Sequence, residues 1–277
     1  MNVTPAVPVT TDTLPVPGAR LHYELRGEGP LVVLVGAPMD ARSFAPLADL
    51  LADEYTVLTT DPRGIFRSTV EDRDQDATAE LRADDLARLI RHVDAGPATV
   101  LGSSGGAVSA LALTQAHADL VSTLVAHEPP SLGLLEDREE LFAGSEEIIA
   151  TYLAGDPVGA MRKFLAQAKI VMPEPVFQQV FGGERDAQQI ADDDFQYQHM
   201  MRPTVRWQPD FAALRAVSSR IVVGIGEDSA GQICERTSEA LAAGLDVESV
   251  RFPGDHIGFA GDPAAFATRL RAVLRES

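Results

Sequence analysis

The stretch Gly102-Ser103-Ser104-Gly105-Gly106 places a serine between two glycines in the pattern Gly-x-Ser-x-Gly. A short apolar run (98–101) precedes it and an Ala- and Leu-rich run (107–113) follows, which predicts a buried strand, a sharp turn and a helix. A serine raised on such a turn needs glycines two residues away on each side, because side chains there would clash with the turn. The helix that starts beneath the serine favours developing negative charge. The motif predicts Ser104 as a nucleophile, against the alternative of a Gly/Ser-rich helix cap.

A serine hydroxyl is a weak nucleophile near neutral pH and needs a positioned base. We predict that His256 is this base, because it lies in a loop directly after the last expected strand (247–252). Packing or surface roles suit four other histidines better: His22 on an edge strand, His92 and His117 on helices, and His199 in the helical stretch 131–213. His127, beside Glu128, should point to the opposite face and is given no catalytic role.

The base in turn needs a carboxylate that accepts from the imidazole and fixes its orientation. Two residues qualify by position. Glu128 follows an expected strand (120–126) and precedes Pro129-Pro130, which would rigidify the chain. Asp228 lies in the loop after another expected strand (220–225). Glu128 could instead be a salt-bridged loop carboxylate, and Asp228 a helix N-cap residue.

Composition narrows the class of protein. The chain has 277 residues, 45% of them hydrophobic, and a net charge of -18, which fits one large globular domain and makes nucleic acid and anionic membranes poor partners. Its single cysteine, Cys234, excludes an internal disulfide, and we see neither a signal-peptide pattern nor an apolar run of membrane-spanning length. We expect a cytoplasmic protein with a small-molecule substrate. The sequence leaves the oligomeric state open. Metal, phosphate-loop and dinucleotide motifs are missing from the sequence, so we expect no metal and no cofactor.

Strands alternate with helices along most of the chain, which predicts an α/β fold with a mostly parallel, doubly wound sheet of about eight strands. Residues 14–17 and 19–26 are expected to form an antiparallel edge, and residues 1 to about 12 a loose arm. The alternation stops over 131–213, where only helical patterns occur. This segment predicts a helical lid inserted into a single domain that spans 1–277.

With these elements in place, the chain resembles the α/β-hydrolase fold superfamily over about residues 14–276. Four features carry the resemblance, in the family's order: the loop Val35-Gly36-Ala37-Pro38, the turn from Asp61 to Ser68, the serine turn, and Gly254-Asp255-His256. The turn matches the family's D-x-R-G-x-G-x-S, except that Phe66 replaces the second glycine.

The resemblance also bears on the acid and on the oxyanion hole. Relatives often place an Asp three residues after a Gly at the end of the penultimate strand, where this chain has Ser229. Other subgroups, including certain haloalkane dehalogenases, have a Glu 24 residues beyond the nucleophile, and that position here is Glu128. We therefore favour Glu128 over Asp228. The fold implies an oxyanion hole made by the backbone N–H groups of Gly105 and Ala37, with Met39 a less favoured second donor.

A serine at the elbow, rather than an aspartate, argues against dehalogenase and epoxide hydrolase chemistry. We predict a lidded serine hydrolase that cleaves a small ester or lactone through an acyl-enzyme. The alternatives are a C–C bond hydrolase or secondary-metabolite enzyme on this fold, or a non-catalytic ligand-binding protein. Met and aromatic residues in the lid predict an apolar substrate, with Met200 and Trp207 as binding residues, although such residues are also typical of lid core.

Overall fold

The computed structural model describes residues 7–276 and contains one twisted, nine-stranded sheet in the order β1-β2-β4-β3-β6-β7-β8-β9, with β5 paired to β2. Strands β1 and β2 are antiparallel to their neighbours, and the pairs from β4 through β9 are parallel. The predicted α/β class and mostly parallel sheet are confirmed. The strands are β1 (Val9–Val16), β2 (Ala19–Arg26), β3 (Leu31–Val35), β4 (Thr56–Thr60), β5 (Thr69–Val70), β6 (Ala98–Ser103), β7 (Val121–His127), β8 (Arg220–Gly226) and β9 (Ser249–Phe252).

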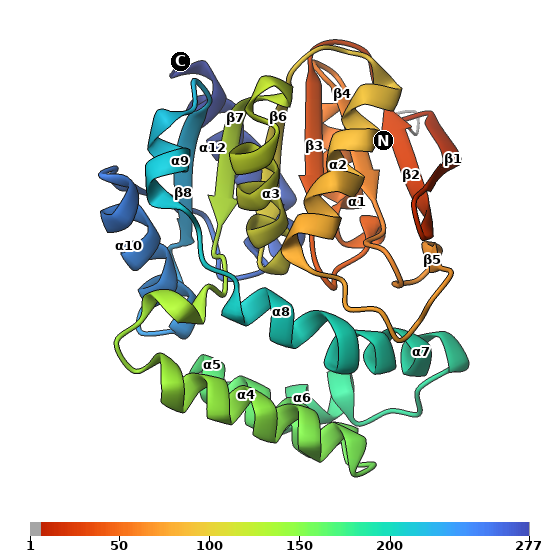
Figure 1. Cartoon of the computed structure of the whole chain (residues 1–277), viewed down its shortest axis with the longest axis vertical. Coiled ribbons are helices and arrows are strands. Elements are labelled where there is room, and N and C mark those ends of the chain that lie inside the picture. The colour runs from red at the N-terminus through yellow and green to blue at the C-terminus, as the bar shows by residue number, and fades with distance from the viewer. Residues whose placement is uncertain (1–6, 277) are drawn as a thin grey trace, which may run out of the picture.

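Helices cover both faces of the sheet, which explains why central strands such as β3 are continuous apolar runs. One face packs against α2 (Ala79–Val93), α3 (Gly105–Ala116), α9 (Phe211–Ala216) and α10 (Ile233–Leu245). The other packs against α1 (Ala45–Leu51), α11 (Gly258–Gly261) and α12 (Pro263–Arg275). Figure 1 shows α2 and α3 in front of the sheet and α12 behind it.

A helical segment lies between β7 and β8 and crosses the end of the sheet to which the parallel strands point (Figure 1). It contains α4 (Arg138–Leu153), α5 (Pro157–Ala168), α6 (Glu174–Phe181), α7 (Ala187–Phe195), a π-helical turn (Gln196–Met200) and α8 (Met201–Arg206). Active sites of α/β folds lie at this end of the sheet, so the segment stands over the predicted chemistry.

Several boundaries differ from the sequence prediction. The expected arm over 1 to about 12 is wrong for Val9 to Asp12, which pair with β2, whereas residues 1–6 lie outside the described residues. The polar stretch before Phe195 forms α7, because Asp186 and Gln189 make a reciprocal capping box at its start. Among residues 7–276, the structure has no helix both long and apolar enough to cross a membrane.

Candidate active site

Ser104 lies at the turn between β6 and α3, with φ 56° and ψ −130°, a backbone conformation that is costly for any residue with a side chain. Its N–H donates to the His127 carbonyl at the end of β7 (3.0 Å), which ties the turn to the neighbouring strand. The flanking glycines are sterically required. A Cβ on Gly102 would lie 2.5 Å from the Gly106 carbonyl oxygen, and one on Gly106 would clash with the carbonyl of Val35.

Glu128 is fully buried directly after β7, and it also has a positive φ (50°). Its backbone N–H donates to the Gly224 carbonyl (3.1 Å), and its Oε1 accepts from the Gly226 N–H (2.8 Å). These contacts with β8 hold the carboxylate in one orientation.

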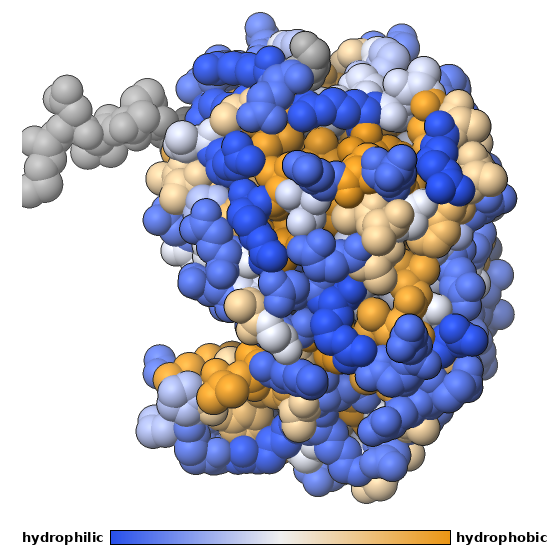
Figure 2. Space-filling view, turned by 90° about the vertical axis from the view of Figure 1, so that its left-hand side faces the viewer, coloured by the Kyte–Doolittle hydropathy of each residue, from blue (hydrophilic) through white to orange (hydrophobic). Residues whose placement is uncertain are grey.

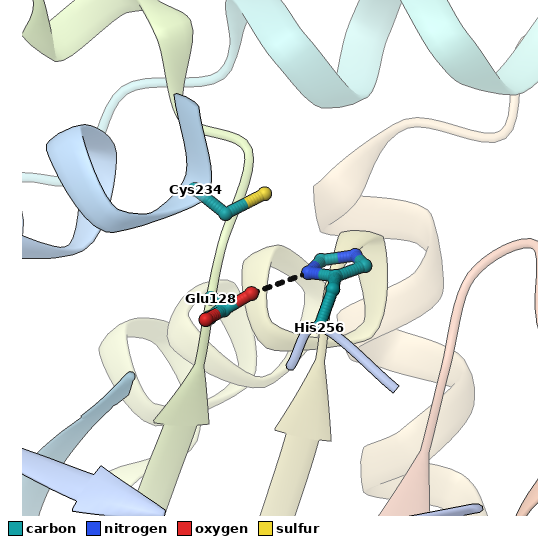
Figure 3. Close-up of side chains that lie close together, drawn as sticks. All are labelled: Glu128, Cys234 and His256. Carbon is teal, nitrogen blue, oxygen red and sulfur yellow. Dashed lines mark hydrogen bonds and ion pairs between the residues drawn. The ribbon is translucent and has the colours of Figure 1, made fainter. Parts of the chain in front are cut away.

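His256 lies in the loop after β9, and its Nδ1 is 2.6 Å from Glu128 Oε2 (Figure 3). Because the neighbouring carboxylate can only accept, Nδ1 carries the proton and Nε2 is left as the basic nitrogen. The loop is fixed from β8, since the backbone N–H groups of Glu227 and Asp228 donate to the carbonyls of Phe252 and Gly254 (2.8 and 3.0 Å).

The electrostatics favour an ionised acid beside a basic imidazole. Burial alone would raise the pKa of Glu128, but the hydrogen bond and charge of His256, aided by the Ser229 hydroxyl, lower it to about 2. Burial would lower the pKa of His256, but Cys234 and the Glu128 carboxylate raise it well above 6.5. His127, in contrast, is fully buried against Phe252 and Phe266, and burial lowers its pKa to about 4.

Ser104 and His256 line one cavity of about 110 Å³ that lies under the helical segment. Its walls come from the loop after β3, the start of α3, helices α5, α8 and α10, and the π-helical turn. The lining residues are mostly apolar: Ala37, Pro38, Gly105, Pro130, Leu132, Phe164, Gln167, Ala168, Gln196, Met200, Met201, Thr204, Val205, Ile233 and Cys234.

Of the two residues predicted to bind substrate, the structure brings only Met200 to this cavity. The prediction for Trp207 is wrong. Its ring packs in the core cluster beside α2 and α3, and its indole N–H donates to Glu80 on α2 (2.9 Å). A Trp with its single donor paired to the sheet domain anchors the end of the helical segment and does not contact the cavity.

The alternative acid, Asp228, is exposed, and its hydrogen bonds come from its backbone: its N–H donates to the Gly254 carbonyl and its carbonyl accepts from the Gln232 side chain. Ser229, at the position where relatives often have an Asp, is fully buried beside Glu128. The structure therefore brings Glu128 to His256 and leaves the Asp228 carboxylate in solvent.

Ala37 and Gly105 approach each other closely at the floor of the cavity. A Cβ on Gly105 would lie 2.5 Å from the Ala37 carbonyl oxygen, so the loop after β3 and the start of α3 are in close contact beside the cavity that both residues line. Ala37 is followed by a cis peptide bond to Pro38. Met39, the less favoured donor, lines a neighbouring hollow rather than this cavity.

The predicted site did not include Cys234, which lies at the start of α10 and faces both Glu128 and His256 (Figure 3). Sequence position gives no signal for this contact. The three residues follow or begin different elements, and only the order of strands in the sheet brings them together.

Known proteins share sequence and fold with this chain. Residues 31–269 match the model of the alpha/beta hydrolase family. A curated relative, "Uncharacterized hydrolase YraK" of Bacillus subtilis, is 30% identical over 97% of both chains. The 2-(acetamidomethylene)succinate hydrolase of Mesorhizobium japonicum is 31% identical over 60% of this chain and 61% of its own. Among solved structures, a thermophilic esterase from Thermogutta terrifontis superposes with a TM-score of 0.69 at 21% identity, covering 96% of this chain and 98% of that one.

Proposed function

Because this chain belongs to the alpha/beta hydrolase family, we propose that it is a serine hydrolase that cleaves a small, uncharged ester or lactone through an acyl-enzyme on Ser104. The observation that carries the proposal is the 2.6 Å hydrogen bond between His256 Nδ1 and the buried Glu128, at a cavity that the strained Ser104 also lines. A merely structural histidine would not need a serine held at a costly backbone conformation on the wall of the same cavity.

The proposed reaction has two steps. In the first, His256 Nε2 takes the Ser104 proton as the hydroxyl attacks the carbonyl carbon, while Glu128 stabilises the imidazolium. The N–H groups of Gly105 and Ala37 bind the tetrahedral oxyanion, and the imidazolium returns the proton to the leaving oxygen. In the second step, the same imidazole activates water, which attacks the acyl-enzyme and releases the acid.

The cavity supports a small apolar acyl group. Among the described residues that line it, none is Lys or Arg. Two of its polar side chains already have partners, since Thr204 donates to the Met200 carbonyl (2.7 Å) and Gln167 donates to Ser145 (3.0 Å). A substrate carboxylate would lose its water there without gaining a Lys or Arg partner. We propose that the helical segment 131–213 acts as the lid that excludes water from this cavity.

The same chemistry extends to an amide or to a C–C bond beside a carbonyl. Because one relative is named as a 2-(acetamidomethylene)succinate hydrolase, the substrate panel below also includes an amide and a β-diketone. Its named substrate is a succinate derivative, for which the described lining of this cavity offers neither Lys nor Arg.

The test combines active-site labelling with a substrate panel. A fluorophosphonate should label the wild-type protein at Ser104 and fail to label Ser104→Ala. Purified protein should hydrolyse acetate and butyrate esters and small lactones, with much lower kcat/KM for hemisuccinate esters. Labelling that persists in Ser104→Ala, or labelling without turnover of any ester, lactone, amide or β-diketone, would contradict the proposal.

A further inference from the structure

Three side chains that can ligate a metal converge beside the cavity: the Glu128 carboxylate, the Cys234 thiol and the His256 imidazole. One ligand atom from each lies within 4.8 Å of the others, and the three come from the end of β7, the start of α10 and the loop after β9. Figure 3 shows the thiol directed toward the space between the carboxylate and the ring. The cluster thus contains one oxygen, one sulfur and one nitrogen ligand.

This donor set selects among cations. Thiolate and imidazole are ligands of zinc and other soft divalent ions, whereas magnesium and calcium require mainly oxygen. Three protein ligands with a fourth position left open are typical of accessible zinc sites. Here Cys234 and His256 both line the cavity, so the fourth position would face it.

An acidic hollow lies next to the cavity. It has a volume of about 480 Å³, shares Pro38 and Gln196 with the cavity, and is lined by four carboxylates, Asp40, Glu184, Asp192 and Asp193, and by Arg185. Two of these carboxylates already have partners, since Asp40 pairs with Arg42 and Asp193 with Arg185. Figure 2 shows the molecule hollowed at its left side, above a lower lobe with apolar patches. Together with the net charge of -18, this lining raises the local concentration of cations near the cavity.

We propose that Glu128, Cys234 and His256 form an inhibitory site for a thiophilic divalent cation such as Zn²⁺. Bond lengths of about 2.0–2.3 Å to zinc place ligand atoms about 3–4 Å apart. The ring therefore withdraws slightly from the carboxylate to admit the ion. The thiol releases its proton to solvent on binding, and Glu128 binds as the carboxylate.

The mode of inhibition follows from the histidine tautomer. A metal on Nδ1 replaces the proton that Glu128 now accepts, and that proton moves to Nε2. An imidazole protonated at Nε2 cannot accept the Ser104 proton, so the nucleophile loses its base. The binding site does not depend on the proposed hydrolase activity, but the inhibition does.

Binding is tested without turnover. Ser104→Ala keeps all three ligands, and titration of this variant with cobalt(II) chloride should give one equivalent of bound ion and an intense sulfur-to-cobalt charge-transfer absorption. The absorption should vanish when Cys234→Ser or Cys234→Ala is added, with folding followed by circular dichroism. It should persist with His117→Gln as a control, because His117 pairs with Asp84 away from the cavity (2.9 Å).

Inhibition is tested on the active protein with zinc chloride and a neutral ester. Hydrolysis should fall with zinc and recover on addition of a chelator. Loss of the sulfur ligand should raise the half-inhibitory zinc concentration by about tenfold or more. Absence of the cobalt absorption in Ser104→Ala, or inhibition that both Cys234 variants leave undiminished, would overturn the proposal. Cobalt binding in a protein that turns over no ester, lactone, amide or β-diketone would overturn the proposed function and leave the metal site standing.

Discussion

The hydrogen bond between Glu128 and His256 makes the sharpest prediction at the scale of single residues. Glu128→Gln keeps the volume of the side chain but removes the charge that orients and stabilises the imidazolium, so kcat should fall by about 10³–10⁴-fold. The matched variant Asp228→Asn changes an exposed carboxylate and should keep kcat within about twofold of wild type. Steady-state kinetics on one neutral ester decides the assignment, and a larger loss from Asp228→Asn would reverse it.

The pKa of His256 makes a second prediction. The imidazole acts as a base only when it is neutral, and Cys234 and Glu128 raise its pKa well above 6.5 against the effect of burial. The kcat/KM should therefore rise with pH, with a midpoint above 6.5. In Glu128→Gln the residual activity should rise at a lower pH, because the imidazolium loses its partner. A wild-type profile that is flat from pH 6 to 9 would show that His256 does not act as the base.

At the residue scale, the sequence supports a prediction where a motif fixes backbone geometry. Ser104 was predicted from the glycines around it and Glu128 from its spacing from that serine. The structure brings Glu128 to His256 and places Ser104 and His256 on one cavity. Cys234 was missed, since no local pattern marks a thiol that meets its partners only through the sheet. Trp207 was assigned wrongly, because an aromatic residue in a helical segment looks the same whether it faces a cavity or a core.

At the scale of elements, the elbow depends on a close approach of three backbone segments. In Gly106→Ala the added methyl would clash with the Val35 carbonyl at the end of β3, so the strand or the helix must shift. We expect a loss of about 2 kcal/mol or more in the free energy of unfolding and a large loss of activity. The control Gly261→Ala adds its methyl where no atom lies within 4 Å, and it should leave both quantities nearly unchanged.

The two glycine variants are compared by their Tm in thermal unfolding and by their rate of ester hydrolysis. On the usual scale for a domain of this size, 2 kcal/mol corresponds to a fall in Tm of about 4–8 °C. An unchanged Tm in Gly106→Ala would mean that β3 and α3 are less closely packed than described here.

The turn from Asp61 to Ser68 shows what a sequence motif can and cannot predict about a local element. The pattern placed the turn correctly and flagged Phe66 as a departure from the family's glycine. In the structure Phe66 keeps a positive φ (49°), its N–H donates to Asp192 (2.8 Å), and the Arg42 guanidinium lies 3.7 Å from its ring centroid. These contacts come from distant segments, so a local pattern could not predict how the chain tolerates the substitution.

At the scale of the whole molecule, the net charge of -18 should act on the choice of substrate. An anionic ester is repelled by the acidic surface before it reaches a cavity without a described Lys or Arg. Its kcat/KM should lie below that of a neutral ester with the same alcohol, and the gap should narrow as salt screens the surface charge. The comparison needs a hemisuccinate and a butyrate ester, each measured across a series of sodium chloride concentrations. A gap that does not respond to salt would place all of the discrimination in the cavity.

The general architecture could be predicted because buried strands and amphipathic helices alternate so regularly from β3 through α3 and again from β8 to α12. The helical segment could be recognised from the sequence, but the packing of its helices could not be predicted, since they pack through contacts between distant residues. Tyr152 on α4, for example, stacks on Tyr197 (4.4 Å between centroids) and donates to Asp194 (2.6 Å).

The buried Ser229 beside Glu128 has a consequence for how this family exchanges its acids. Adjacent strands β7 and β8 deliver side chains to one imidazole, and a carboxylate on either could serve it. Adding Ser229→Asp to Glu128→Gln should then restore part of the lost turnover. Such a rescue would show that position 229 can also carry the acid of this site. The carboxylate could then move from β7 to the loop after β8 by two substitutions, while the serine and the histidine stay in place.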